Sequence, residues 1–140
     1  MGTITMFDHT ADVGLRVEAD SLAELFELAA IGMFDYVVAN RSDVQERENM
    51  SVALNAMSTA DLLVAWLSEL IFLSETKHRL YTRFEVEIES SGHSLAATIH
   101  GEPIDRSRHE LDHEVKAVTQ HGLVLEQRNG QWLAELILDI

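Results

Sequence analysis

Alternation of apolar and polar side chains is the feature of this sequence that most restricts its fold. A period of two puts every second side chain on one face of a β-strand, so such segments predict strands with one buried face. Strands of this kind are typical of antiparallel sheets covered on one side. The strand-like segments are residues 4–6, 13–19, 50–56, 84–89, 95–100, 115–126 and 131–138.

Two segments instead carry apolar residues at helical spacing. The first covers residues 21–38 and begins with Ser21 and Glu24, which form a capping box. The second begins at Ser58 and runs to about residue 74, with Asp61 in its first turn. We expect two amphipathic helices packed on mostly antiparallel sheet, which is an α+β fold in a single domain covering residues 1–140.

Asn129-Gly130 is the strongest hairpin signal, because both residue types accept the positive φ angles of a tight turn. A two-residue turn there pairs Arg128 with Gln131, and an uninterrupted ladder places Gln120 opposite Asp139. Lys116 would then lie about 13 Å along the strand from Gln120, and a bulge would change this.

Residues 102–113 contain the only proline, Pro103, among mixed charges. This composition predicts an exposed, mobile connection that a partner or substrate could order.

The overall charge narrows the range of functions. Twenty-four acidic against ten basic residues give a formal charge of -14, so the surface field opposes phosphate backbones, and strong direct nucleic-acid binding is not expected. The absence of cysteine leaves carboxylate and imidazole as the side chains for a metal site. The sequence shows neither a secretory signal nor a membrane span, which predicts a cytoplasmic protein.

Residues 7–14, Phe-Asp-His-Thr-Ala-Asp-Val-Gly, gather two carboxylates, an imidazole and a hydroxyl at the entrance of a strand. One interpretation is a turn whose side chains bond their own backbone, and the other is an oxygen-rich corner for a hard cation. Asp139 and the main-chain carboxylate of Ile140 are candidate partners, because a cation would relieve their mutual repulsion. A frayed, solvated end is the alternative, and helix capping alone would explain Asp61.

Together these motifs resemble the archease family over almost the whole chain, in order and spacing. One difference is Gln120, where the family usually has tyrosine. The matching segments are HTADVG at 9–14, LAELF at 22–26, DLL at 61–63, GE at 101–102, EVKAVT at 114–119 and LDI at 138–140.

The resemblance implies a small α+β protein that is not itself an enzyme. Its expected partner is the GTP- and metal-dependent RNA-splicing ligase of the RtcB family, which acts in tRNA splicing and RNA repair. The implied role is to promote transfer of GMP onto the ligase and to sustain multiple turnover. An acidic protein should be steered toward the electropositive active site of such a ligase.

The resemblance also implies a divalent cation, calcium in the first place, with manganese or magnesium as alternatives. Its implied ligands are Asp12, Asp139 and a carboxyl or carbonyl oxygen of Ile140. Further candidates, for contacts around the metal or with the partner, are His9, Asp61, Glu102 and Lys116.

Two rival functions stay open from the sequence. A metal-dependent hydrolase could use Asp12 and Asp139 with one of His9, His100 or His121, although no histidine has the spacing of a zinc hydrolase motif. A chaperone-like modulator of another RNA enzyme, such as an RNA methyltransferase, fits the acidic composition equally well. Homo-oligomerisation is left open.

Overall fold

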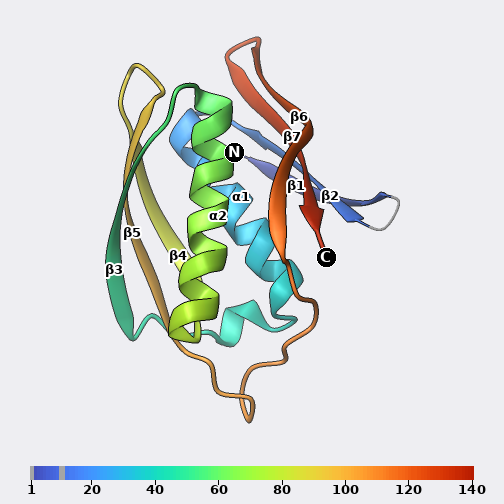
Figure 1. Ribbon diagram of the computed structural model, residues 1–140, viewed down its shortest axis with the longest axis vertical. Helices are drawn as coiled ribbons and strands as arrows, with labels where there is room; N and C mark the ends of the chain where they lie inside the picture. Colours follow the sequence, from blue (N-terminus) through green and yellow to red (C-terminus); the bar gives the residue numbers. More distant parts are fainter. Residues whose placement is uncertain (1, 10–11) are drawn as a thin grey trace.

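The computed structural model describes residues 2–9 and 12–140, and its elements follow the alternating and helical patterns of the sequence (Figure 1). In the described part of the chain, no helix has the length and apolar character needed to cross a membrane. The elements in chain order are β1 (Thr3–His9), β2 (Asp12–Ala19), α1 (Leu22–Val37), the short 3₁₀ helix η1 (Arg41–Asp43), β3 (Glu48–Asn55), α2 (Thr59–Lys77), β4 (Arg79–Ile88), β5 (Ser94–Pro103), β6 (Ala117–Arg128) and β7 (Gln131–Asp139).

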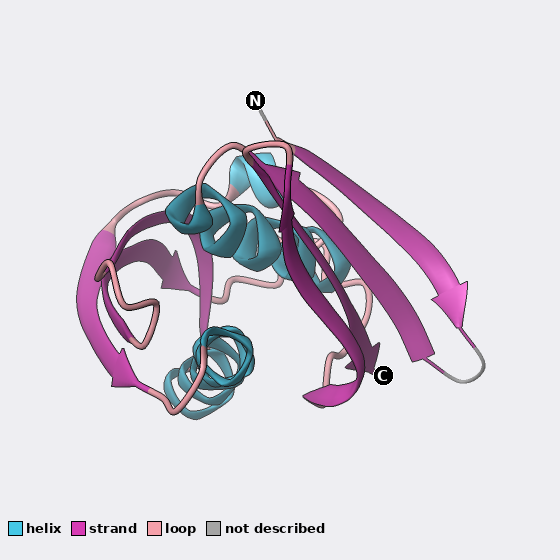
Figure 2. Ribbon diagram, turned by 90° about the horizontal axis from the view of Figure 1, so that it is seen from above, coloured by secondary structure: helices cyan, strands magenta, loops and turns pink. Residues whose placement is uncertain are grey.

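The strands form two antiparallel sheets, so the predicted α+β class is confirmed. One sheet has the order β1-β2-β7-β6 and the other the order β3-β5-β4. Figure 2 shows the sheets on either side of the helices, with α2 seen end-on between them and α1 beside it. The helices therefore supply the apolar layer against which the inner faces of both sheets are buried.

Helix α1 begins where the capping box predicted. The Ser21 hydroxyl accepts the Glu24 N–H at 3.1 Å, and the Glu24 carboxylate accepts the Asp20 N–H at 2.8 Å. The helix packs on β4 and β2, and its buried residues include Phe26 and Phe34. Because it is covered by both sheets, α1 holds the centre of the core.

Helix α2 ends three residues beyond the expected residue 74. His78 adopts a left-handed conformation with φ of 54° and donates its N–H to the Ser74 carbonyl, which closes the last turn. In its middle, Trp66 is fully buried and donates its indole N–H to the Phe26 carbonyl at 2.9 Å. The rings of Trp66 and Phe84 also form a T-shaped pair with their centroids 6.1 Å apart, so one side chain joins both helices and a sheet.

The turn of the β6–β7 hairpin is the predicted one, but the register further along it is not. Asn129 and Gly130 have φ of 52° and 80°, and Arg128 pairs with Gln131 as expected. An irregularity between Thr119 and Val124 then shifts the ladder, so Ala117 and not Gln120 lies opposite Asp139. The Thr119 hydroxyl accepts the His121 N–H at 3.0 Å, which stabilises the extra residues of this bulge.

Candidate metal centre

Asp12 and Asp139 lie directly opposite each other on the neighbouring strands β2 and β7. Directly opposed residues of an antiparallel pair point to the same face with Cβ atoms about 5 Å apart. Asp12 is half-buried and Asp139 is exposed, on the side of the sheet away from the helices. Two like charges at this separation destabilise the pair, and a cation between them would reverse the effect.

The main chain around Asp139 is held from a third strand. Ala117 of β6 is its partner on the other side, and the Lys116 N–H donates to the Asp139 carbonyl at 2.7 Å. The expected separation of Lys116 from Asp139 was therefore wrong, because the bulge shifts β6 by three positions. Ile140 follows directly and is 37% exposed, so its main chain lies next to the carboxylate pair.

Phe7 and Gly14 are the first and last residues of the Phe-Asp-His-Thr-Ala-Asp-Val-Gly motif, and they have a packing role. They are cross-strand partners, and a Cβ on Gly14 would lie 2.1 Å from the Phe7 ring. The ring therefore needs glycine beneath it. The backbone of His9 pairs with that of Asp12, so the β1–β2 ladder ends next to the carboxylate pair. The side chain of His9, and Thr10 and Ala11 altogether, lie outside the described residues.

Asp61 combines the capping position expected of it with a contact to β6. Its N–H donates to the Ser58 hydroxyl at 3.1 Å, while its carboxylate accepts Nε2 of Gln120 at 2.6 Å. Gln120 lies inside the β6 bulge. In this chain Asp61 therefore ties the start of α2 to the bulge that sets the register at Asp139.

Glu102 is an internal residue, whereas most of the connection that follows it to residue 113 is exposed, as expected. Glu102 and His109 are 1% and 3% exposed, and their side chains are joined at 2.9 Å. The Glu102 carboxylate also accepts the Gln45 N–H at 2.7 Å and the guanidinium of Arg108 at 2.5 Å. A buried carboxylate must be paired in this way, so its partners pin the connection onto the fold.

The same contacts determine the acidity of Glu102. Burial would raise the pKa of its carboxyl, but the hydrogen bonds from Gln45, Arg108 and His109, with the charge of Arg108, outweigh that effect and lower the pKa from 4.5 to about 2. Glu102 is therefore charged at every physiological pH and serves as the anchor of the connection.

The side-chain ligands that Asp12 and Asp139 offer are carboxylate oxygens, which suit a hard cation such as calcium, magnesium or manganese. Within the described ranges, no three His, Asp or Glu side chains gather where they could share one metal ion. A cation between Asp12 and Asp139 would draw its further donors from main-chain oxygens, such as that of Ile140, and from water. His100 lies in the other sheet and contacts Glu85 at 2.6 Å, so it does not join the carboxylate pair.

Sequence reasoning missed the partners of Glu102 and Asp61 and a cavity beside α2. Arg108, His109 and Gln120 carried no spacing signal, because each contact crosses between elements whose packing the sequence does not state. The cavity, of about 470 Å³, lies between α1, α2 and residues 104–115. Its lining is dispersed along the chain, which leaves no local pattern to find.

The sequence matches the model of the Archease protein family (MTH1598/TM1083) over residues 5–140. A protein archease from Pyrococcus abyssi is 38% identical over 137 residues, which cover 96% of each chain. A protein archease from Methanothermobacter thermautotrophicus is also 38% identical, over 136 residues and 96% of each chain. The chain belongs to the archease family.

Two solved structures share the fold. The solution structure of protein 1598 of Methanobacterium thermoautotrophicum has a TM-score of 0.85 and 36% identity, and the match covers 98% of both chains. The crystal structure of an archease of Thermotoga maritima, described as a possible chaperone, has a TM-score of 0.66 and 20% identity over 96% of this chain and 94% of that one. The second likeness concerns the fold alone.

Proposed function

We propose that this chain is a non-catalytic accessory protein that binds a divalent cation and activates a GTP-dependent RNA-splicing ligase of the RtcB family. The observation that carries the proposal is the register that sets Asp12 opposite Asp139. The ligands would be these two carboxylates and a main-chain oxygen of Ile140, with calcium the first candidate and manganese or magnesium the alternatives. The metal, when bound, would neutralise the carboxylates and present a positive centre on an acidic surface.

The charge of the chain supports a protein partner rather than RNA. A formal charge of -14 repels phosphate but favours association with an enzyme whose active site is lined by lysine, arginine and metal ions. In this role the chain promotes transfer of GMP onto the ligase and its repeated turnover in tRNA splicing and RNA repair.

The decisive experiment measures guanylylation of the cognate ligase with labelled GTP, with and without this protein, over a range of metal concentrations. We expect a faster rate with the wild-type chain, and loss of most of the stimulation in Asp12→Asn and Asp139→Asn. Glu87→Gln is the matched control, because Glu87 is an exposed acid on β4 of the other sheet. An unchanged rate at every metal concentration would refute the proposal.

Metal binding is measured separately by thermal unfolding. A cation in hundredfold excess over its dissociation constant stabilises the folded state by about 2.7 kcal/mol. We expect this gain in the wild type and in Glu87→Gln but not in Asp12→Asn or Asp139→Asn. Equal gains in all four proteins would mean that the ions only screen the acidic surface.

A chaperone-like modulator of another RNA enzyme and a metal-dependent hydrolase give different outcomes. Recovery of an RNA methyltransferase instead of the ligase in a pull-down from cells would favour the first. Turnover of phosphoesters by the purified protein alone would favour the second.

A further inference from the structure

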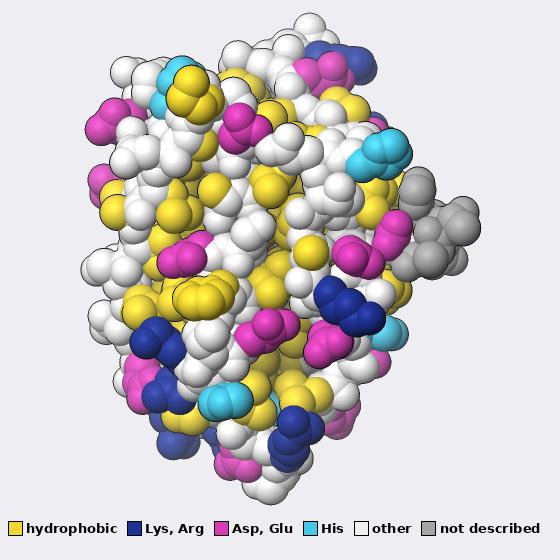
Figure 3. All heavy atoms as spheres, viewed as in Figure 1, with side chains coloured by type: hydrophobic (Ala, Val, Ile, Leu, Met, Phe, Trp, Pro, Cys, Tyr) yellow, Lys and Arg dark blue, Asp and Glu magenta, His cyan; other side chains and the backbone are white. Residues whose placement is uncertain are grey.

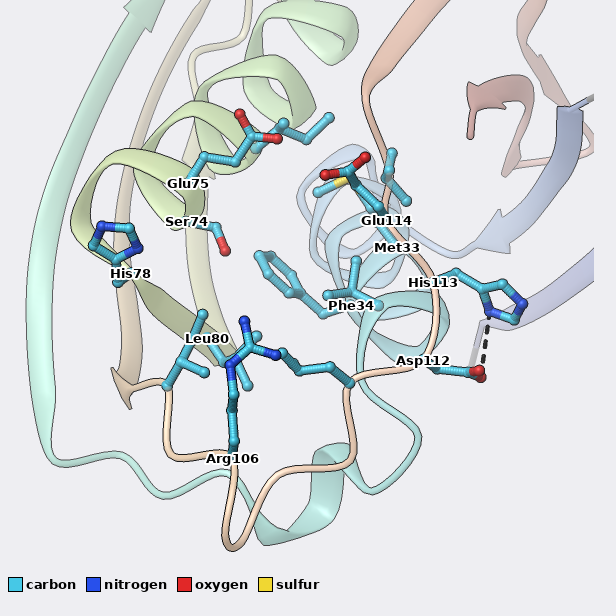
Figure 4. A pocket seen from close by; sticks show the side chains of 15 residues that line it. Met33, Phe34, Ser74, Glu75, His78, Leu80, Arg106, Asp112, His113 and Glu114 are labelled. Carbon is cyan, nitrogen blue, oxygen red and sulfur yellow. Dashed lines mark ion pairs between the residues drawn. The ribbon is translucent and has the colours of Figure 1, made fainter.

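The cavity beside α2 has the size and walls of a binding site. Its volume of about 470 Å³ falls within the range of about 300–1,000 Å³ that is usual for ligand pockets. Apolar side chains from both helices, from the start of β4 and from the 104–115 connection form its walls, among them Phe34, Ile71, Leu80 and Val115. Figure 4 shows Phe34 and Leu80 in this lining. An apolar group would be removed from water there.

The walls are held in place by the main chain, so the cavity exists before anything binds. The Asp112 N–H donates to the Val37 carbonyl at 2.8 Å, and the Ala39 N–H donates to the Glu110 carbonyl at 2.8 Å. Leu111, between these bonds, forms a β-bridge with Val38 and lines the cavity. A preformed site spares its guest most of the ordering cost.

The rim of the cavity is acidic. Glu75, Asp112 and Glu114 line it with Arg106 as the one basic residue of the lining, besides His78 and His113. Asp112 already contacts Nδ1 of His113 at 3.3 Å. Figure 4 shows Glu75 on α2 and Glu114 on the connection that faces this helix. Among the described contacts, neither of these two has an ion-pair or hydrogen-bond partner, so the rim complements a guest with positive charge.

An exposed aromatic ring points to a protein as the guest. Phe72 is 58% exposed and lies one helical turn from Glu75 on α2. Leu111, on the cavity wall, is 37% exposed. Large apolar side chains exposed beside an apolar cavity are typical of interaction surfaces, and a small ligand held inside the cavity would leave Phe72 in water.

The cavity is connected to the carboxylate pair by three consecutive residues. Glu114 and Val115 line the cavity, and the next residue, Lys116, bonds the Asp139 carbonyl at 2.7 Å. Figure 3 shows this side of the molecule, with acidic side chains distributed among exposed apolar ones. The main chain therefore links one wall of the cavity to the strand end that carries Asp139, although the carboxylate pair lies on the opposite face of the sheet.

We propose that the cavity receives an apolar side chain from a basic segment of the partner enzyme, whose flanking lysine or arginine residues pair with Glu75 and Glu114. The apolar group fills the space between the helices, and the flanking cations replace water around two unpaired carboxylates. That the partner is the RNA ligase rests on the proposed function, whereas the chemistry of the cavity does not.

The test uses two peptides that differ only in charge, acetyl-Lys-Phe-Lys-amide and acetyl-Glu-Phe-Glu-amide, titrated into the ¹⁵N-labelled full chain at physiological salt. We expect saturable shifts of the backbone amides of Ile71, Leu111 and Val115 with the basic peptide, and binding at least about tenfold weaker with the acidic one. Shifts scattered over the surface, or equal affinity for both peptides, would overturn the proposal.

The variant that tests the rim is Glu75→Gln/Glu114→Gln. The control is Glu87→Gln/Glu89→Gln, which removes the same charge at two exposed positions outside the cavity lining. We expect the first pair of changes to weaken the basic peptide about fivefold or more and the second to leave its affinity unchanged, because general attraction to an acidic chain affects both equally. If both variants bind the basic peptide equally weakly, its binding reflects general attraction to an acidic chain, and the proposal is overturned.

The same variants are then compared in binding to the cognate ligase. Weaker binding of Glu75→Gln/Glu114→Gln alone supports the cavity as the docking site. If the wild-type chain activates the ligase and both variants bind it equally, the docking proposal fails while the proposed function stands. If the basic peptide saturates the cavity but the ligase is not activated, the proposed function fails and the cavity chemistry stands.

Discussion

Replacing Glu102 by glutamine removes one buried charge with almost no change of shape. The side chain is 1% exposed and accepts from Gln45, Arg108 and His109. One pKa unit is worth about 1.4 kcal/mol, so a pKa lowered from 4.5 to about 2 makes the charged carboxylate contribute about 3 kcal/mol to folding at pH 7. We expect Glu102→Gln to lose about that amount.

The sign of the pH dependence follows from the lowered pKa. The contribution is fully present above the unfolded value of 4.5 and is lost as pH falls through the folded value of about 2. The difference between wild type and Glu102→Gln should therefore shrink from about 3 kcal/mol at pH 7 to about 1 kcal/mol at pH 3.

The assay is urea unfolding at several pH values between 3 and 7, followed by the fluorescence of Trp66 and Trp132. Glu89→Gln is the control, because Glu89 is exposed and should change stability by less than about 0.5 kcal/mol. A stability difference for Glu102→Gln that is the same at pH 3 and pH 7 would refute the assignment of the lowered pKa. A difference below about 1 kcal/mol at pH 7 would show that the Arg108 and His109 contacts do little for the fold.

Three further predictions concern single contacts. Trp66→Ala should destabilise the fold by about 3–5 kcal/mol, since Trp66 is fully buried; a melting temperature within a degree or two of wild type would contradict its packing. Gly14→Ala should cost about 1–3 kcal/mol through the clash with Phe7, and combining it with Phe7→Ala should give a non-additive loss in a double-mutant cycle. Gln120→Ala removes the hydrogen bond to the Asp61 carboxylate and should lower the free energy of unfolding in urea by about 1 kcal/mol. Adding Asp61→Ala should then cause no second loss from this hydrogen bond.

Local signals predicted the elements of the fold well. The Ser21 and Ser58 caps set the starts of both helices, and Asn129-Gly130 set the final hairpin, because each acts within a few residues. The division of the strands into two sheets was not predicted, since alternation gives a buried face but not the identity of the neighbouring strand. The bulge after Thr119 was missed for a related reason: its hydroxyl bond to His121 leaves no mark in the alternation.

The candidate site was predicted in part. The register sets Asp12 opposite Asp139, as a shared cation requires, while the binding of metal stays a prediction. Glu102 matched a family position, but its burial depends on Arg108 and His109 folding back over it, which is a tertiary event. The sequence places Asp61 at the start of a helix. Its hydrogen bond to Gln120 could not be predicted, because Gln120 lies in the bulge that shifts the register of β6.

The position of β7 between β2 and β6 has a consequence for the order in which the chain can assemble. Strand β2 is made from residues 12–19, but its inner neighbour is made from residues 131–139. At a synthesis rate of about 5–20 residues per second, roughly 10 s separate the two on the ribosome. During that interval the β1–β2 hairpin carries an unpaired edge, which invites pairing with other chains. The sheet can therefore be completed only after residues 131–139 have been synthesised, and its long-range pairing predicts folding on the slower millisecond-to-second scale.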